Sequence, residues 1–291
     1  MDDKNYDFLA TQLEMTGFPE SLREPLREKL QAGDAAFVLN YQAEIKKEQV
    51  NATLFFKKSA ESEKYFFNSY RLLLTNEQHP NGLGQTFYIT NKKMEEGQDK
   101  FKRDFTLKEG YNLLARADVP NEQRYVFGKW QKKDGELYNA WKGLDISETD
   151  KNGNFVFKNY HDSYGFKIEK SLASLPIRDK DKNDPELIRS LQKGNLVSVK
   201  NDANEIMYIA AYPPGRRINL FDKEMKLVNA PDQKAERKVT TRNANEMSQA
   251  QQVNDTETGY VAANKKKLNS VADTGDDIEG TSEKRGRRRR M

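Results

Sequence analysis

The C-terminal end of the chain holds the residues whose chemistry is easiest to assign. Five arginines and a lysine fall within seven residues, at Lys284, Arg285, Arg287, Arg288, Arg289 and Arg290. Such charges repel one another unless a polyanion neutralises them, and the planar donors of arginine match phosphate. A shorter run stands upstream at Lys265, Lys266 and Lys267. We predict that these nine residues contact nucleic acid, either DNA or RNA; the alternative is that they only keep the chain soluble.

Mechanisms that depend on histidine have few candidate residues, because the chain contains two histidines. His79 precedes a proline in a predicted loop, and we expect a solvated turn residue. His161, Asp162 and Ser163 supply the residue types of a catalytic triad, but three consecutive residues rarely converge as nucleophile, base and orienter. We therefore expect His161 to pack at a strand end and its two neighbours to shape a turn.

Other site classes are also weakly represented. The absence of cysteine excludes disulfides, thiol nucleophiles and thiolate metal sites. The loop Asp150-Lys151-Asn152-Gly153-Asn154 faintly resembles a calcium loop, yet it lacks the later bidentate glutamate, and a hairpin turn is favoured. Phosphate-binding loops, dinucleotide fingerprints and nucleophile elbows are missing. The sequence predicts a non-enzymatic protein with no catalytic residue, metal or cofactor.

Two aromatic segments, residues 64–71 and 151–160, mix Phe and Tyr with Lys and Arg. Sheet-based binders of single-stranded nucleic acid stack bases on exposed aromatics and hold phosphates with cations. The favoured interpretation is simpler: one face of each strand lies in the core and the other in water. We expect Trp130 and Trp141 to pack in the same way.

Charge and aromatic content separate a folded body from a tail. Residues 230–291 hold 13 of the 49 Lys and Arg and 10 of the 45 Asp and Glu, which leaves 36 basic and 35 acidic residues in 1–229. Tyr260 is the one aromatic residue of the tail. We expect the tail to be disordered, because it cannot bury enough apolar surface to order itself. The nearly neutral body predicts no polyanion partner.

Hydrophobic periodicity predicts an α+β fold in which helices are followed by antiparallel β-meanders. Helices are expected over Tyr6–Met15, Glu20–Ala32, a turn or two after the Thr106 capping box with Glu109, Phe166–Leu175, and a stretch from Asp184-Pro185 to Gly194. Strands are expected over Ala36–Ile45, Ala52–Lys58, Lys64–Leu74, Thr86–Thr90, Arg124–Gln131, Leu137–Ile146, Asn154–Tyr160, Leu196–Lys200, Ile206–Tyr212, Arg217–Phe221 and Lys226–Val228.

These elements suggest units at 1–105, 106–182 and 183–229, followed by the tail at 230–291. The units share one plan, a helix followed by antiparallel strands. Two interpretations remain open: the units are true internal repeats, or they share only the pattern that any helix-to-strand junction shows. The acidic N-terminus and the lack of an apolar run of about 18 residues predict a cytoplasmic protein without a membrane partner.

Several strand and turn motifs stand out along the chain: Tyr138-Asn139-Ala140-Trp141, Leu144-Asp145, Asn152-Gly153-Asn154-Phe155, Tyr164-Gly165-Phe166, Leu175-Pro176-Ile177 and Ile218-Asn219-Leu220-Phe221-Asp222. With these motifs the sequence resembles an uncharacterised family carried on conjugative elements and plasmids of Bacteroidota. The likeness covers most of residues 1–229. It implies a bacterial, mobile-DNA context and an accessory role, and it carries over no site residue.

The sequence thus favours a non-enzymatic accessory protein of a mobile genetic element. Its body would bind another macromolecule, including an unidentified protein partner, and its basic tail would contact nucleic acid. The alternative is a protein-interaction module, for example an inhibitor of a host factor, with a solubilising tail.

Overall fold

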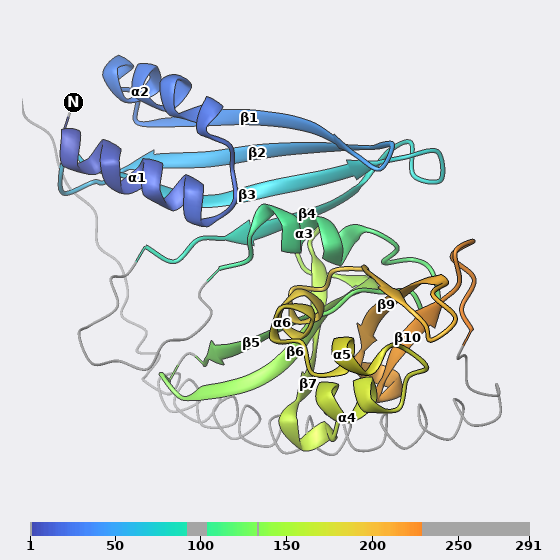
Figure 1. Ribbon diagram of the computed structural model, residues 1–291. Helices are drawn as coiled ribbons and strands as arrows, with labels where there is room; N and C mark the ends of the chain where they lie inside the picture. Colours follow the sequence, from blue (N-terminus) through green and yellow to red (C-terminus); the bar gives the residue numbers. More distant parts are fainter. Residues whose placement is uncertain (1, 92–103, 133, 229–291) are drawn as a thin grey trace, which may run out of the picture. The chain divides into compact units, whose positions relative to one another are not determined.

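The computed structural model describes residues 2–91, 104–132 and 134–228. They belong to one compact unit, Met1–Ala230, which is distinct from residues 231–291. Helices precede antiparallel sheets along this unit, which confirms the predicted α+β class (Figure 1). The division into three units at 1–105, 106–182 and 183–229 stays a prediction.

Two helices open the chain. α1 (Asp3–Met15) begins three residues earlier than predicted, because the Asp2 side chain accepts hydrogen bonds from two backbone N–H groups of the first turn. The second predicted helix is split into a 3₁₀ turn, η1 (Glu20–Leu22), and α2 (Arg23–Ala32). Pro25 lies in the first turn of α2, where its missing N–H costs no hydrogen bond.

The first sheet is an antiparallel meander in the order β1-β2-β3-β4, with α1 and α2 on one face (Figure 1). Its strands are β1 (Ala36–Ile45), β2 (Glu48–Lys58), β3 (Tyr65–Thr75) and β4 (Leu83–Tyr88). β2 starts four residues before the predicted Ala52, because a two-residue turn pairs Ile45 with Glu48. β4 starts and ends earlier than the predicted Thr86–Thr90, since its register on β3 pairs Leu74 with Leu83.

A middle sheet follows α3 (Leu107–Leu114), whose Thr106–Glu109 capping box is formed as predicted. The sheet has the order β5-β6-β7, with β5 (Val126–Gln131), β6 (Leu137–Thr149) and β7 (Phe155–His161). The Asp150 side chain accepts from the backbone N–H groups of Asn152 and Asn154, so the loop is the predicted hairpin turn.

The last part combines short helices with a three-stranded sheet of order β10-β9-β8. The elements are η2 (Asp162–Tyr164), α4 (Ile168–Ala173), α5 (Asp179–Lys182), α6 (Pro185–Gln192), β8 (Val197–Lys200), β9 (Ile206–Tyr212), η3 (Pro213–Gly215) and β10 (Arg217–Phe221).

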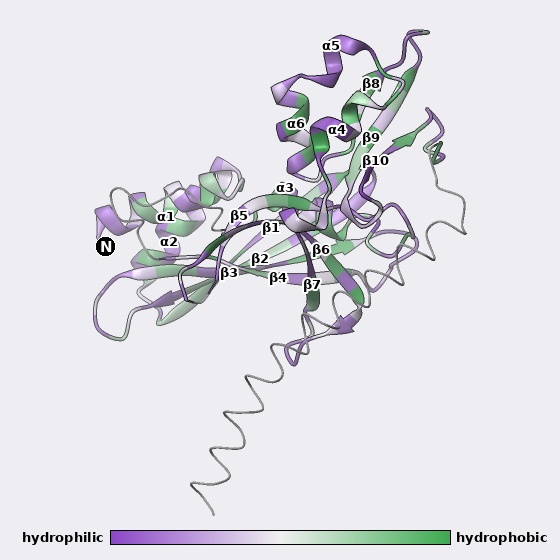
Figure 2. Ribbon diagram, turned by 90° about the horizontal axis from the view of Figure 1, so that it is seen from below, coloured by the Kyte–Doolittle hydropathy of each residue, from purple (hydrophilic) through white to green (hydrophobic). Residues whose placement is uncertain are grey.

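Three expectations for this part need correction. α4 is shorter than the predicted Phe166–Leu175. Residues 179–182, for which no helix is predicted, form the one-turn helix α5, which Figure 2 shows as hydrophilic throughout. The predicted strand Lys226–Val228 is reduced to a single bridge between Phe221 and Leu227, because the turn at Asp222 leaves room for only one pairing.

The middle sheet joins two hydrophobic clusters. Val126 and Leu144 pack with the first sheet, α1, α2 and α3, whereas Tyr125 and Trp141 pack with α4, α6 and the last sheet. Phe105 bridges the first cluster to the middle sheet, with its ring stacked on Phe157 at a centroid distance of 5.2 Å.

A side chain also joins the first two sheets. Gln85 on β4 is 2% exposed. Its Oε1 accepts from Phe155 N at 2.8 Å, and its Nε2 donates to the Phe155 carbonyl at 3.4 Å. Gln85 therefore pairs with β7 as a neighbouring strand would.

Replacing Gln85 by leucine should lower the free energy of unfolding by about 1–3 kcal/mol, because the Phe155 N–H would be buried without an acceptor. Urea denaturation measures this. Gln42→Leu, at an exposed position of β1, is the matched control and should change the free energy by less than about 0.5 kcal/mol. Equal effects of the two substitutions would contradict the proposed link.

Candidate functional site

An open cavity of about 630 Å³ lies where the β1–β2 turn, α3, α6 and β8 meet. Such a volume is in the usual range for small-molecule sites. The lining combines charged side chains with smaller polar and apolar ones. The lining residues are Lys46, Glu48, Lys108, Tyr111, Asn112, Ala115, Arg116, Arg124, Ser190, Asn195, Leu196, Val197, Ser198 and Met225.

Four cations line this cavity against one carboxylate. Lys46 comes from the β1–β2 turn, Lys108 from the first turn of α3, and Arg116 and Arg124 from the chain between α3 and β5. Arg116 is paired with the Glu122 carboxylate at 2.8 Å. Within the described ranges, Lys46, Lys108 and Arg124 lie within 4 Å of no carboxylate. We call this site the cationic cavity.

Arg124 is the buried member of the set, with 6% of its surface exposed. Its Nε donates to the Glu122 carbonyl at 3.1 Å, but its Nη1 is buried and has no hydrogen-bond partner. Burial lowers the pKa of the guanidinium to about 10, and the neighbouring Arg116 lowers it further while Glu122 opposes the shift. A buried, charged donor without a partner is costly.

Lys108, an exposed residue on α3, adds a second cation beside Arg124. Burial lowers the pKa of its ammonium group, and repulsion from Lys46 and Arg124 acts in the same direction. The ammonium lies 4.6 Å from the centre of the Tyr111 ring, a cation–π contact. The positive charges of the cavity are therefore close enough to destabilise one another.

Glu48 is the one carboxylate among the lining residues, and two neutral donors hold it in place. Tyr111 Oη donates to one oxygen at 2.8 Å and Asn76 Nδ2 to the other at 3.0 Å. Burial and the hydrogen bond to Glu48 raise the pKa of Tyr111, so the phenol stays protonated as the donor.

Amide hydrogen bonds fix another part of the lining. Asn112 on α3 donates through Nδ2 to the Lys193 carbonyl at 2.9 Å and to Asn195 Oδ1 at 2.8 Å. Asn195 in turn donates to Ser190 Oγ on α6 at 3.1 Å. These bonds hold α3 against the end of α6 and keep the cavity walls apart at a set distance.

The backbone around the cavity is strained. Lys46, Arg116 and Met225 all line it, and all three have positive φ, at 51°, 64° and 65°. Non-glycine residues in this region cost of order 1–3 kcal/mol each, and such strain clusters at functional sites. The β1–β2 turn is the clearest case, because Lys46 and Lys47 stand where hairpins of this kind favour Asn-Gly.

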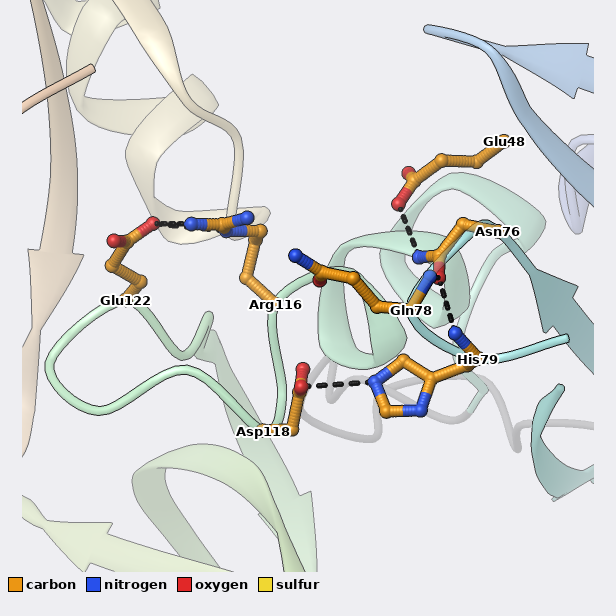
Figure 3. A network of polar contacts seen from close by, with 7 residues as sticks. All are labelled: Glu48, Asn76, Gln78, His79, Arg116, Asp118 and Glu122. Atoms are coloured by element: carbon orange, nitrogen blue, oxygen red, sulfur yellow. Dashed lines mark hydrogen bonds and ion pairs between the residues drawn. The ribbon is translucent and has the colours of Figure 1, made fainter.

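A polar network adjoins the cavity and corrects the expectation for His79 (Figure 3). His79 is not a solvated turn residue: its side chain is 25% exposed, and its Nε2 lies 2.9 Å from Asp118 Oδ2. Its backbone N–H donates to Asn76 Oδ1, and Asn76 reaches on to Glu48. Local sequence patterns do not predict this pairing, because the two partners lie 39 residues apart.

The residues around His161 behave as the sequence predicts. Its ring packs on Tyr138 at a centroid distance of 5.1 Å, and burial lowers its pKa. Asp162 opens the 3₁₀ turn η2 and accepts a hydrogen bond from Asn139, not from His161. Trp130 and Trp141 are buried, as expected.

The nine predicted nucleic-acid contacts, from Lys265 to Arg290, lie outside the described residues. Within the ranges that are described, no group of three or more His, Cys, Asp or Glu side chains could hold a metal ion. Among the helices there, none has the length and apolar character to span a bilayer.

Sequence reasoning missed the cationic cavity because its cations come from separate elements. Lys46-Lys47 gives no local signal either, because the next strand is predicted to begin at Ala52 and the two-residue turn appears only in the structure. No protein-family model, curated protein or solved structure matches this chain. The roles of the cavity residues are therefore inferred from their chemistry.

Replacing Lys46-Lys47 by Asn-Gly should raise the free energy of unfolding by about 1–3 kcal/mol, because both new residues tolerate positive φ. Urea denaturation of the single substitutions Lys46→Asn and Lys47→Gly shows how much each contributes. A destabilised Asn-Gly variant would contradict the turn geometry.

Proposed function

We propose that this protein binds nucleic acid and that its folded part holds a phosphate group in the cationic cavity. The observation that carries the proposal is the set of three cations around the cavity, Lys46, Lys108 and the buried Arg124, which lack a carboxylate partner within the described residues. A phosphate bound there would accept hydrogen bonds from these side chains, and its charge would reduce the repulsion among them.

Phosphate fits these donors better than other anions do. Arginine presents paired N–H donors in a plane that matches two phosphate oxygens, and lysine adds a compact charge. A phosphate within a nucleic-acid strand and a phosphate at its end would be bound by the same donors. The remaining lining, which includes apolar and amide side chains, would contact the sugar and base that a phosphate carries.

We propose that the tail supplies a second set of contacts with nucleic acid. Its lysine and arginine runs would neutralise backbone phosphates without reading sequence, while the cavity would accept one phosphate in a defined geometry. The resemblance to proteins of conjugative elements supports an accessory role on mobile DNA. We propose binding, not catalysis, because the one carboxylate of the cavity is already held by two donors.

A protein-interaction module with a solubilising tail is the second candidate, and the nearly balanced charge of residues 1–229 favours it. Affinity capture from lysate separates the two functions. Partners that persist after nuclease treatment would support the second candidate, and partners that vanish would support the first.

Pyrophosphate should stabilise the full-length protein through the cationic cavity. At ten times its Kd the gain is about 1.4 kcal/mol, which raises Tm by about 2–4 °C. Arg124→Gln should abolish the rise, and Lys108→Met should reduce it. The exposed α2 variant Arg23→Gln is the control and should keep it.

Thermal unfolding isolates the cavity from the tail, because a segment that binds equally well in the folded and unfolded states does not shift Tm. An undiminished rise in Arg124→Gln, or no rise in the wild type, would rule out the cavity as a phosphate site.

The tail should set the salt dependence of DNA binding. In a mobility-shift titration on duplex DNA, deleting residues 283–291 should reduce the slope of log K against log salt by up to about 5, since six cations are lost. A full-length variant with these six replaced by glutamine is the matched control for length. Unchanged affinity in both would show that the tail is not the contact.

A further inference from the structure

The face of the first sheet that points away from α1 and α2 carries a row of exposed apolar side chains. Val38 on β1 pairs with Phe55 on β2, Phe55 pairs with Ser69 on β3, and Ser69 pairs with Tyr88 on β4. The four residues thus cross the whole sheet in one line. We call this line the aromatic row.

The exposure of the row contrasts with the opposite face. Val38 is 40%, Phe55 37% and Tyr88 64% exposed, whereas Phe56 and Phe87, their neighbours along β2 and β4, are 2% exposed. The core therefore has its own aromatic residues on the other face and does not need those of the row.

Two cations border the row on the same face. Lys57 lies two residues beyond Phe55 on β2, and Arg71 lies two residues beyond Ser69 on β3. Neither has a carboxylate within 4 Å among the residues that the structure describes. The nearest cross-strand neighbours of Arg71 are the polar Thr53 and Thr86.

We propose that the aromatic row binds single-stranded nucleic acid, with one base stacked on Phe55, another on Tyr88, and phosphates held by Lys57 and Arg71. The inference rests on the proposed nucleic-acid function but places a separate surface on the protein. Aromatic platforms bordered by cations are the usual means of binding single strands.

The spacing of the row suits two bases. Phe55 and Tyr88 are separated by one strand, so their strands lie about 10 Å apart. At that distance the rings cannot clamp one base between them, and each receives a base of its own. Ser69, the small residue between them, is buried beneath its neighbours.

A protein partner fits the row less well. A stable interface covers about 800 Å² on each side with a contiguous apolar centre. Here three apolar side chains stand in a single line, and the next line consists of Asn40, Thr53, Arg71 and Thr86. A narrow apolar line beside unpaired cations matches a single-stranded polyanion.

The test measures the affinity of the full-length protein for a fluorescent oligothymidylate and for a duplex of equal length. Phe55→Leu/Tyr88→Leu keeps apolar, sheet-compatible residues but removes the rings. It should weaken single-strand binding about 5- to 100-fold for each stacked base and leave duplex binding unchanged.

Two controls accompany the double variant. Phe55→Tyr/Tyr88→Phe keeps both rings and should bind as the wild type does. Met15→Ala/Ile206→Ala removes exposed apolar side chains elsewhere and should also have no effect.

Each outcome has a distinct meaning. Unchanged single-strand affinity in the leucine variant, with wild-type binding intact, overturns the aromatic row alone. Loss of self-association in that variant with unchanged nucleic-acid affinity assigns the row to a contact between copies and also overturns it. Failure of the wild type to bind either nucleic acid overturns both this inference and the proposed function.

Discussion

Helix α3 is held from both sides, and the cationic cavity depends on this constraint. On one side Gly110 packs so closely that a Cβ there would lie 2.9 Å from the Phe87 ring of the first sheet. On the other side Asn112 donates to the Lys193 carbonyl at the end of α6. α3 therefore cannot shift toward either neighbour, and the charges it carries stay at a fixed distance from those of the adjoining loops.

The cavity is costly to maintain when it is empty. Positive φ at Lys46 and Arg116 costs of order 1–3 kcal/mol each, and a buried donor without a partner costs a similar amount. Together these costs are a considerable fraction of the roughly 5–15 kcal/mol that stabilises a typical domain. A bound anion would offset the electrostatic part of the cost, whereas the backbone strain would remain as the condition for placing Lys46 at the cavity.

The extent to which the sequence predicts this structure depends on how local each signal is. The capping box at Thr106, the N-cap at Asp184 and the hairpin turn at Asn152-Gly153 involve neighbours in the chain, and all three form. The pairing of His79 with Asp118 and the convergence of the cavity cations depend on tertiary packing. The net charge does not predict the cavity for the same reason: nearly equal numbers of acidic and basic residues in 1–229 are compatible with a dense local cluster of cations.

The two proposed surfaces of the folded part would act on different chemical parts of one ligand. The cationic cavity interacts through charge and hydrogen bonds, so salt weakens it, whereas stacking on the aromatic row depends on the base and tolerates salt. Contacts to phosphates position a nucleic acid without reading its sequence, whereas stacking on a ring needs a base that is free of its duplex partner. A nearly neutral body is suited to this division, because a strongly positive one would bind every duplex and mask the weaker preference that stacking provides.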